Sequence, residues 1–236
     1  MPFRNSVSIV ASPRARVGKT LLARLLVDFH RQEGRSIAAF DLNAGGATLA
    51  QFLPERTTVS EIADVKGQMA LFDRLIADDG TTKVVDLGHE SFEAFFALVH
   101  KIGFVEEARR RAIAPAILFL ITPDATSVEA FRALRRRFPQ ALLSPVHNEI
   151  FGPAQHRDKY ELKDAMLTRL PALAPGLRKY VETPPFSFAE SQLAVPADVP
   201  IDVNLEVDRW LRRAYLEFRE LDLRILLTDL KSSIRL

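Results

Sequence analysis

The feature that most restricts the fold is a short apolar strand that leads through a loop into a Gly-Lys-Thr triplet and an apolar helix. "SVSIVA" (6–11) is the expected strand, and residues 18–32 place their leucines at helical spacing. The triplet at 18–20, Gly-Lys-Thr, matches the end of a phosphate-binding loop. The usual spacing, G-x-x-x-x-G-K-[ST], puts glycine where this chain has Pro13. The segment is therefore either a phosphate-binding loop of unusual sequence or an ordinary strand–turn–helix.

Apolar strands and helical segments alternate through the first 150 residues. The strands are continuous apolar runs, which is typical of a parallel sheet covered on both faces. The sequence therefore predicts an α/β fold, doubly wound around a mostly parallel sheet, with a C-terminal helix. The expected strands are 6–11, 36–43, 83–88, 116–122 and 141–148, and the expected helices are 18–32, 59–78, 91–112 and 126–138.

Length and composition indicate one soluble domain. Residues 1–236 are enough for a single α/β domain with a substantial core, and 203–235 have the apolar spacing of an amphipathic helical segment of that domain. The chain has no cysteine, which excludes disulfides and thiolate zinc sites. No apolar run approaches the ~18 residues of a membrane span, and charge interrupts the N-terminal stretch before a signal-peptide core forms. We expect a cytoplasmic protein.

The loop and two strand ends offer the groups that a bound triphosphate requires. In a phosphate-binding loop, backbone N–H groups surround the phosphates, a lysine reaches the β- and γ-phosphates and a hydroxyl residue holds magnesium. Lys19 and Thr20 can take the last two roles. Asp41 and Asp86 each end an apolar strand, where a carboxylate near magnesium is expected. The expected magnesium ligands are Thr20, Asp41 and Asp86, and the expected phosphate-loop residues are Pro13, Arg14, Ala15, Arg16, Val17, Gly18, Lys19, Thr20 and Leu21.

These motifs resemble those of the ParA/MinD ATPases over most of residues 5–150. "PRARVGKT" is similar to the deviant Walker A loop of that family, K-G-G-x-G-K-[ST]. "DLNAGGATLAQFL" resembles its second motif, D-x-D-P-x-G, and "KVVDLG" resembles its Walker B strand. The resemblance implies ATP and Mg²⁺ as cofactors, with Asn148 of "VHNE" contacting adenine. It also implies a homodimer that encloses nucleotide and recruits DNA or an unidentified protein partner, as in partition systems.

A narrower resemblance is to the TraL/StbB-like ATPases of conjugative plasmids. "VVDLGHESF" is similar to their "VVID-G-x-x-SF" stretch. "NEIFGP" (148–153) is similar to their "N-x-x-x-GP" stretch. This likeness implies a role in plasmid conjugation or partition.

Three departures from the family pattern bear on turnover. Arg14 stands where the family has its signature lysine, which reaches across a dimer interface, and Arg16 replaces a glycine and offers a second candidate for that role. Asn43 replaces a carboxylate that orients the attacking water in the family. An amide can hold water but cannot accept its proton. The resemblance thus implies catalytic roles for Lys19, Arg14, Asp41 and Asn43, with slow hydrolysis and retained binding.

Other functions remain open at this stage. The chain can be a degenerate nucleotide-binding scaffold without turnover that acts through protein–protein contact. An amidoligase or kinase on the same fold would need a second substrate motif, which we do not find. Net charge is only +2, so the basic clusters are either solvated helix faces or a DNA-binding patch. Membrane binding by the terminal helix is not expected, because acidic residues mix into its polar face. The basic clusters are 109–111, 135–137, 178–179 and 212–213.

Overall fold

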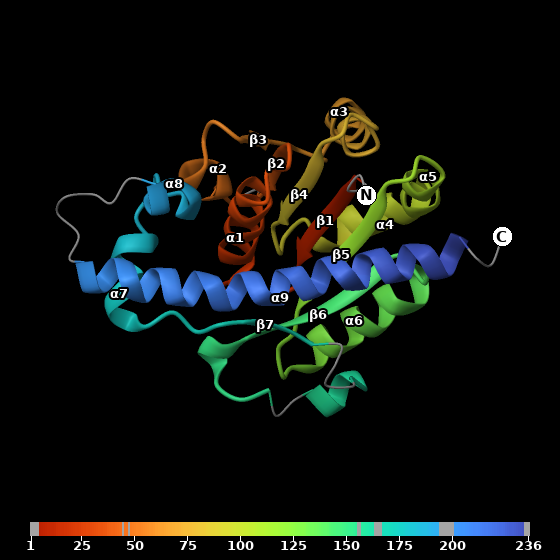
Figure 1. Cartoon of the computed structure of the whole chain (residues 1–236). Coiled ribbons are helices and arrows are strands. Elements are labelled where there is room, and N and C mark those ends of the chain that lie inside the picture. The colour runs from red at the N-terminus through yellow and green to blue at the C-terminus, as the bar shows by residue number, and fades with distance from the viewer. Residues whose placement is uncertain are drawn as a thin grey trace.

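One parallel sheet organises the molecule (Figure 1). The structure is a computed structural model that describes residues 5–43, 45–46, 48–154, 157–162, 167–193 and 201–233. Within these residues seven strands pair in the order β3-β2-β4-β1-β5-β6-β7, and all six pairings are parallel. The strands are β1 Ser6–Ala11, β2 Ile37–Leu42, β3 Thr57–Val59, β4 Thr82–Leu87, β5 Ala114–Leu120, β6 Leu142–Asn148 and β7 Thr168–Leu170.

Helices cover both faces of this sheet, which confirms the predicted doubly wound α/β fold. One buried apolar cluster joins α3, α4, α5 and α6 to the sheet. A second cluster joins α1, α2, α7, α8 and α9 to the opposite face. The α-helices are α1 Lys19–Gln32, α2 Thr48–Phe52, α3 Val65–Leu75, α4 Phe92–Lys101, α5 Phe104–Arg110, α6 Ala125–Arg137, α7 Pro175–Val181, α8 Phe188–Leu193 and α9 Ile201–Ser233, and the 3₁₀ turns are η1 Glu149–Phe151 and η2 Arg157–Tyr160.

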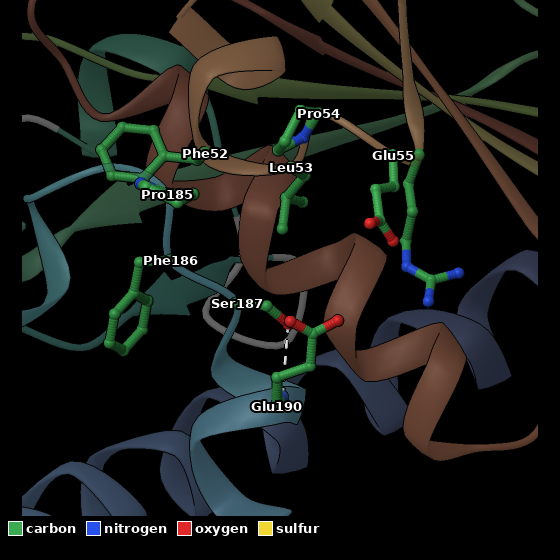
Figure 2. Close-up of a pocket in the computed structure, with 9 residues that line it drawn as sticks. Phe52, Leu53, Pro54, Glu55, Pro185, Phe186, Ser187 and Glu190 are labelled. Atoms are coloured by element: carbon green, nitrogen blue, oxygen red, sulfur yellow. Dashed lines mark hydrogen bonds between the residues drawn. The ribbon is translucent and has the colours of Figure 1, made fainter. Parts of the chain in front are cut away.

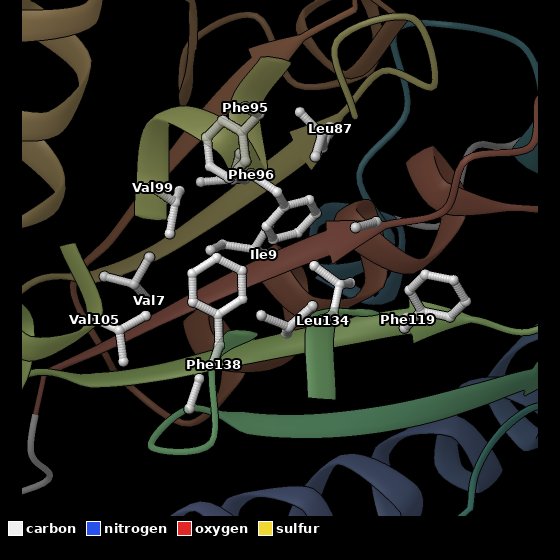
Figure 3. Close-up of a cluster of buried hydrophobic side chains, with 14 of the residues drawn as sticks. Val7, Ile9, Leu87, Phe95, Phe96, Val99, Val105, Phe119, Leu134 and Phe138 are labelled. Atoms are coloured by element: carbon white, nitrogen blue, oxygen red, sulfur yellow. The ribbon is translucent and has the colours of Figure 1, made fainter. Parts of the chain in front are cut away.

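The central strand β1 contributes to both cores. Val7 and Ile9 belong to the cluster under α4, where Phe95 and Phe96 pack against the sheet (Figure 3). Val10 belongs to the cluster under α1. Because successive side chains of a strand point to opposite faces, an unbroken apolar strand serves two layers at once. The loop that follows β1 is therefore fixed from both sides.

Helix α9 packs along the sheet and covers the apolar cluster beneath α1. Trp210 is buried and donates its indole Nε1–H to the carbonyl oxygen of Pro171 at 2.9 Å. Phe218 is also buried, and its ring lies edge-on to Phe29 of α1. The expected amphipathic helix is thus present and buries one face. Among the described helices, none combines the length and apolarity that crossing a bilayer requires.

Two predicted helices have the wrong bounds. The segment 59–78 does not begin as a helix: β3 occupies its start, and α3 begins only after Asp64, whose Oδ1 accepts from the backbone N–H of Gly67 at 2.7 Å. The segment 91–112 divides into α4 and α5 at Gly103, where φ is 63°. Apolar spacing runs through both boundaries, so periodicity alone could not locate the cap or the left-handed residue.

Two short elements near the carboxyl edge of the sheet were not predicted. Helix α2 follows β2 and buries Leu49, and strand β7 pairs with the end of β6. Each is too short to show a clear period in the sequence. Their position places them next to the strand ends that carry the candidate site residues.

Candidate functional site

The loop after β1 forms a tight turn. Gly18 was expected to allow such a turn, whereas the positive φ of Arg16 was not expected. Gly18 has a φ of 98°, and a Cβ added there would lie 2.6 Å from Nδ2 of Asn148. Arg16 also has positive φ, at 57°, a left-handed conformation that costs an L-residue about 1–2 kcal/mol. Glycine is therefore favoured at position 18, whereas Arg16 adopts a left-handed conformation that a non-glycine residue rarely takes.

Lys19 lies beneath this loop. Its side chain is buried, and Nζ donates to the carbonyl oxygen of Arg14 at 2.6 Å. Burial lowers the pKa of Lys19, and the charge of Asp86 opposes that shift. The ammonium group is thus held where the loop turns, within electrostatic reach of Asp86 and at the start of α1. This is the end of the helix that favours bound anions.

Thr20 and Asp86 are in direct contact. Thr20 Oγ1 donates to Asp86 Oδ2 at 2.7 Å and lies 3.1 Å from Oγ1 of Thr48 at the start of α2. Asp86 is fully buried, and its Oδ1 has no hydrogen-bond partner among the described residues. A buried carboxylate oxygen without a donor is costly unless a cation or donor joins it. These atoms fit a hard divalent cation such as Mg²⁺, which prefers oxygen ligands.

Asn43 bridges the two strand-end carboxylates. Its Nδ2 donates to Asp41 Oδ1 at 2.6 Å and to Asp86 Oδ2 at 3.1 Å. Burial, aided by the charge of Asp41, raises the pKa of Asp86 to about 6, although the hydrogen bonds from Thr20 and Asn43 and the charge of Lys19 oppose the shift. The amide thus partly neutralises a carboxylate pair that would otherwise repel.

Asp41 also fixes the neighbouring helix. Its Oδ2 accepts from the backbone N–H of Ala50 in α2 at 3.0 Å, and its Oδ1 accepts from Asn43. Both carboxylate oxygens of Asp41 therefore already have protein donors, whereas Oδ1 of Asp86 has none among the described residues. The structure ties Asp41 to the position of α2. Within the described residues, no group of three or more His, Cys, Asp or Glu side chains forms a metal cluster.

Asn148 contacts the loop from the end of β6. Its Nδ2 donates to the carbonyl oxygen of Val17 at 3.1 Å, and its Oδ1 accepts from the backbone N–H of Ile150 at 3.2 Å. The side chain lies against Gly18. In this arrangement Asn148 holds the loop; the expected contact with adenine stays a prediction.

Arg14 is bound within its own chain. Its Nε and Nη2 donate to Oδ1 of Asp124 at 2.9 and 2.5 Å. Asp124 also accepts from the backbone N–H of Ser127 and caps α6, and the hydrogen bond from Arg14 holds the pKa of Asp124 well below its usual range. The Arg14 side chain remains 44% exposed, so it faces the open side of the loop.

The remaining loop residues surround these groups. Ala15 and Arg16 are exposed, whereas Val17 is buried and packs in the core beneath α1. Pro13 and Leu21 are half-buried. The carboxyl ends of β1, β2, β4 and β6 thus bring together every residue expected to line a nucleotide or hold magnesium, because parallel strands end at one edge.

Several basic clusters have acidic partners. Arg212 pairs with Asp208 at 2.8 Å, and Arg213 lies 3.3 Å from Glu149. Arg135 lies 3.8 Å from Glu161. These pairs favour solvated helix faces over a dedicated anion-binding patch for these side chains.

A cavity of about 260 Å³ lies away from these residues, between the end of α2 and the turn before α8 (Figure 2). Its lining includes Phe52 and Pro54 near α2, and Pro185, Phe186 and Glu190 near α8. None of the residues expected to bind nucleotide or magnesium lines it. The cavity is therefore separate from the candidate site.

Comparison with solved structures identifies the fold. No protein-family model matches the chain, and no curated protein matches it. A chain of the MinC:MinD cell division protein complex of Aquifex aeolicus superposes with a TM-score of 0.50 and 13% identity, over 89% of this chain and 94% of that one. The fold is that of the ParA/MinD-type P-loop ATPases.

Two further structures are similar over the same share of the chain. The nucleotide-binding protein of Archaeoglobus fulgidus in complex with ADP has a TM-score of 0.45 and 14% identity, over 89% of this chain and 87% of that one. A plasmid partition protein of Borrelia burgdorferi has a TM-score of 0.45 and 11% identity, over 89% and 97%. At these identities the likeness concerns the fold alone.

Within the ParA/MinD-type fold, two residues that the sequence analysis did not assign to the site contact it. Thr48 lies beside the hydroxyl of Thr20, and Asp124 binds Arg14. Asp124 had a sequence signal, since aspartate is a common N-cap and Asp124 lies two residues before the predicted helix 126–138. Thr48 starts a five-residue helix, which gave no comparable signal.

Proposed function

We propose that the chain is a ParA/MinD-like switch protein that binds Mg-ATP at residues 13–21. The contact of Thr20 with Asp86, beside the buried ammonium of Lys19, is the observation that carries the proposal. A lysine, a hydroxyl and a strand-end carboxylate are the three side chains that a phosphate-binding loop uses for a magnesium triphosphate. A strand–turn–helix without a ligand would not need a buried ammonium next to a buried carboxylate.

Thr20 and Asp86 would hold the magnesium ion, since both offer oxygen atoms and Asp86 Oδ1 is without a donor among the described residues. Magnesium in such sites keeps several waters and takes few protein ligands. When bound, it would neutralise charge on the β- and γ-phosphates. Asp41 would position this site indirectly, because it accepts hydrogen bonds from Asn43 and from the backbone of α2.

Hydrolysis by this chain would be slow. Asn43 donates to both carboxylates and presents no group that can accept a proton from water. Lys19 would stabilise phosphate charge, and Arg14 or Arg16 would do so from a second copy in a nucleotide-dependent homodimer. Arginine can contact phosphate through two N–H groups, which suits either residue to the role. Turnover would then depend on positioning and electrostatics alone.

The dimer would in turn recruit a protein partner or bind DNA without sequence preference, in a partition or conjugation system and in the cytoplasm. Binding to DNA would be weak, because non-specific affinities are roughly 10⁻⁴–10⁻⁶ M at physiological salt. The acidic partners of Arg135, Arg212 and Arg213 favour a protein partner. A gel-shift series with and without a non-hydrolysable ATP analogue, at two salt concentrations, separates the two.

A second function is a nucleotide-binding scaffold without turnover. The observation that favours it is the bridge from Asn43 to Asp41 and Asp86, since it gives Oδ1 of Asp41 and Oδ2 of Asp86 a donor without a metal. A scaffold would still bind nucleotide and change partner affinity but would release no phosphate.

Calorimetry and a phosphate-release assay on the same preparation distinguish these functions. The proposal expects heat from Mg-ATP and a low but measurable rate of phosphate release that Lys19→Ala removes. Lys101→Ala is the matched control, because Lys101 is an exposed lysine at the end of α4. Binding without phosphate release would identify the scaffold, and absence of binding would contradict both.

A further inference from the structure

Helix α9 has two apolar faces, of which the sheet covers only one. Along its buried face, Val207, Trp210, Leu211, Ala214, Phe218 and Leu221 belong to the core under α1. On the opposite face, Leu216 is 62% exposed, Leu223 is 60% exposed and Leu227 is 55% exposed. Residues 7 and 11 positions apart lie on one side of a helix, so these leucines form a single outward stripe.

Two opposite charges lie within this stripe. Arg219 and Glu220 are adjacent, and both side chains lie between Leu216 and Leu223 on the exposed side. Arg219 is 59% exposed and pairs with Glu33, the C-cap residue of α1, at 3.0 Å. Glu220 is exposed. When two copies of this segment pack antiparallel, the arginine of each copy faces the glutamate of the other.

We propose that this face of α9 binds the same face of a second copy of the chain, with the two helices antiparallel. A two-fold axis between Arg219 and Glu220 places Leu216 against the partner's Leu223 and Arg219 against the partner's Glu220. Each leucine contact and each ion pair then occurs twice, as an isologous interface requires. The same axis places the aliphatic stem of Arg212 over the partner's Leu227.

The charges of this segment favour a second copy over a bilayer. Glu217, Glu220 and Asp222 alternate with Arg219 and Arg224 in the half of α9 that carries the leucine stripe. An interfacial membrane helix has a strongly basic polar face, whereas this one mixes both signs. Opposite charges beside an apolar seam select partner and orientation in paired helices. The mixed charges therefore specify another helix of the same sequence.

The contact is small and lies apart from the candidate nucleotide site. It spans residues 212–227, a length of roughly 24 Å at 1.5 Å per residue. A contact of this size gives a weak dimer. Because α9 covers a face of the sheet rather than its carboxyl edge (Figure 1), this association needs no nucleotide and no residue of the loop after β1.

Sedimentation equilibrium of the full chain without nucleotide tests the contact. We expect a concentration-dependent monomer–dimer equilibrium that Lys19→Ala leaves unchanged and Leu223→Glu abolishes. Met69→Glu is the matched control, because Met69 is an equally exposed apolar side chain on α3, which covers the opposite face of the sheet. A monomer at all concentrations, or equal loss with Met69→Glu, overturns the proposal.

Charge reversal tests the register. Glu220→Arg leaves the Arg219–Glu33 pair intact and should weaken the dimer about tenfold, since it replaces two attractive contacts by two repulsive ones. Arg219→Glu should weaken the dimer similarly, although it also removes the pair with Glu33. The double variant should restore dimerisation, because each pair between the two copies is rebuilt with reversed sign. Thermal unfolding of each variant checks that the fold persists. A double variant as weak as the singles, or binding of the parent to anionic vesicles that Leu223→Glu removes, overturns the proposal.

Discussion

The amide of Asn43 donates to Asp86 across 3.1 Å, and so joins the end of β2 to the end of β4. The same nitrogen donates to Asp41. A positively polarised NH₂ group thus lies between two carboxylates. Asn43, which cannot accept a proton from water, therefore offsets the repulsion between Asp41 and Asp86.

Asn43→Asp should have two opposite effects. Without magnesium, a third carboxylate next to Asp41 and Asp86 should lower the melting temperature, because the bridging donor is lost and like charges meet. With Mg-ATP, turnover should rise, since one positioned proton acceptor is commonly worth ~10²–10⁴ in rate. Thermal shift with and without Mg²⁺ and phosphate release measure the two effects. An unchanged rate with intact binding would show that the loop or a missing partner limits turnover.

Releasing Arg14 from Asp124 should strengthen nucleotide-dependent dimerisation. Asp124→Ser keeps a side chain that can cap α6 but removes the carboxylate that binds the guanidinium. Arg14 is then free to reach a second copy. Sedimentation with a non-hydrolysable ATP analogue should show a tighter dimer for Asp124→Ser and a weaker one when Arg14 and Arg16 are both alanine. A dimerisation constant that is the same in the parent and in both variants would argue against a role for these arginines.

Gly18→Ala should destabilise the chain more than Gly34→Ala. Both glycines have positive φ, but a Cβ meets Asn148 at position 18 and nothing within 4 Å at position 34. The backbone cost of about 1–2 kcal/mol is common to both, so the difference between the two reports the contact with Asn148. Chemical denaturation measures it. Equal losses would mean that the loop can move away from Asn148.

His30 should make stability fall as pH falls. Burial, with the nearby Arg35, lowers the pKa of His30 to about 3, whereas an unfolded histidine has a pKa near 6.5. Below about pH 6.5 the unfolded chain therefore binds a proton that the folded chain rejects until about pH 3, and stability is lost across that window.

By this linkage His30 should cost about 2 kcal/mol between pH 7 and pH 5. Urea unfolding at the two pH values should show a loss that is smaller by that amount in His30→Gln, since glutamine does not titrate. The variant corrects for other groups that titrate in the same range. An equal pH dependence in parent and variant would mean that His30 is not buried as described.

The sheet was predictable because its strands are buried on both faces and so appear as unbroken apolar runs. The polar residues that end those strands, Asp41, Asp86 and Asn148, were found for the same reason. The contacts between them were not predictable. That Asn43 bridges two carboxylates and that Asn148 lies against Gly18 depend on how strands distant in sequence pair.

Boundaries set by single residues were also missed. The division of 91–112 at Gly103 needs one left-handed residue in an otherwise periodic segment, and the start of α3 depends on one side-chain cap from Asp64. Helix α2, which carries Thr48 to the candidate site, is shorter than two turns and has no period to detect. Sequence pattern thus located the strand ends, and tertiary contacts decided how the side chains there interact.

Calorimetric titration of Mg-ATP into the parent chain and into Lys19→Ala tests the central claim most directly. Lys19 is the buried ammonium beneath the loop, next to Thr20 and Asp86, and it should supply the charge that binds the β- and γ-phosphates. We predict saturable, magnesium-dependent heat for the parent and for Lys101→Ala, and none for Lys19→Ala. No heat in the parent, or equal affinity in Lys19→Ala, would contradict a nucleotide site at this loop.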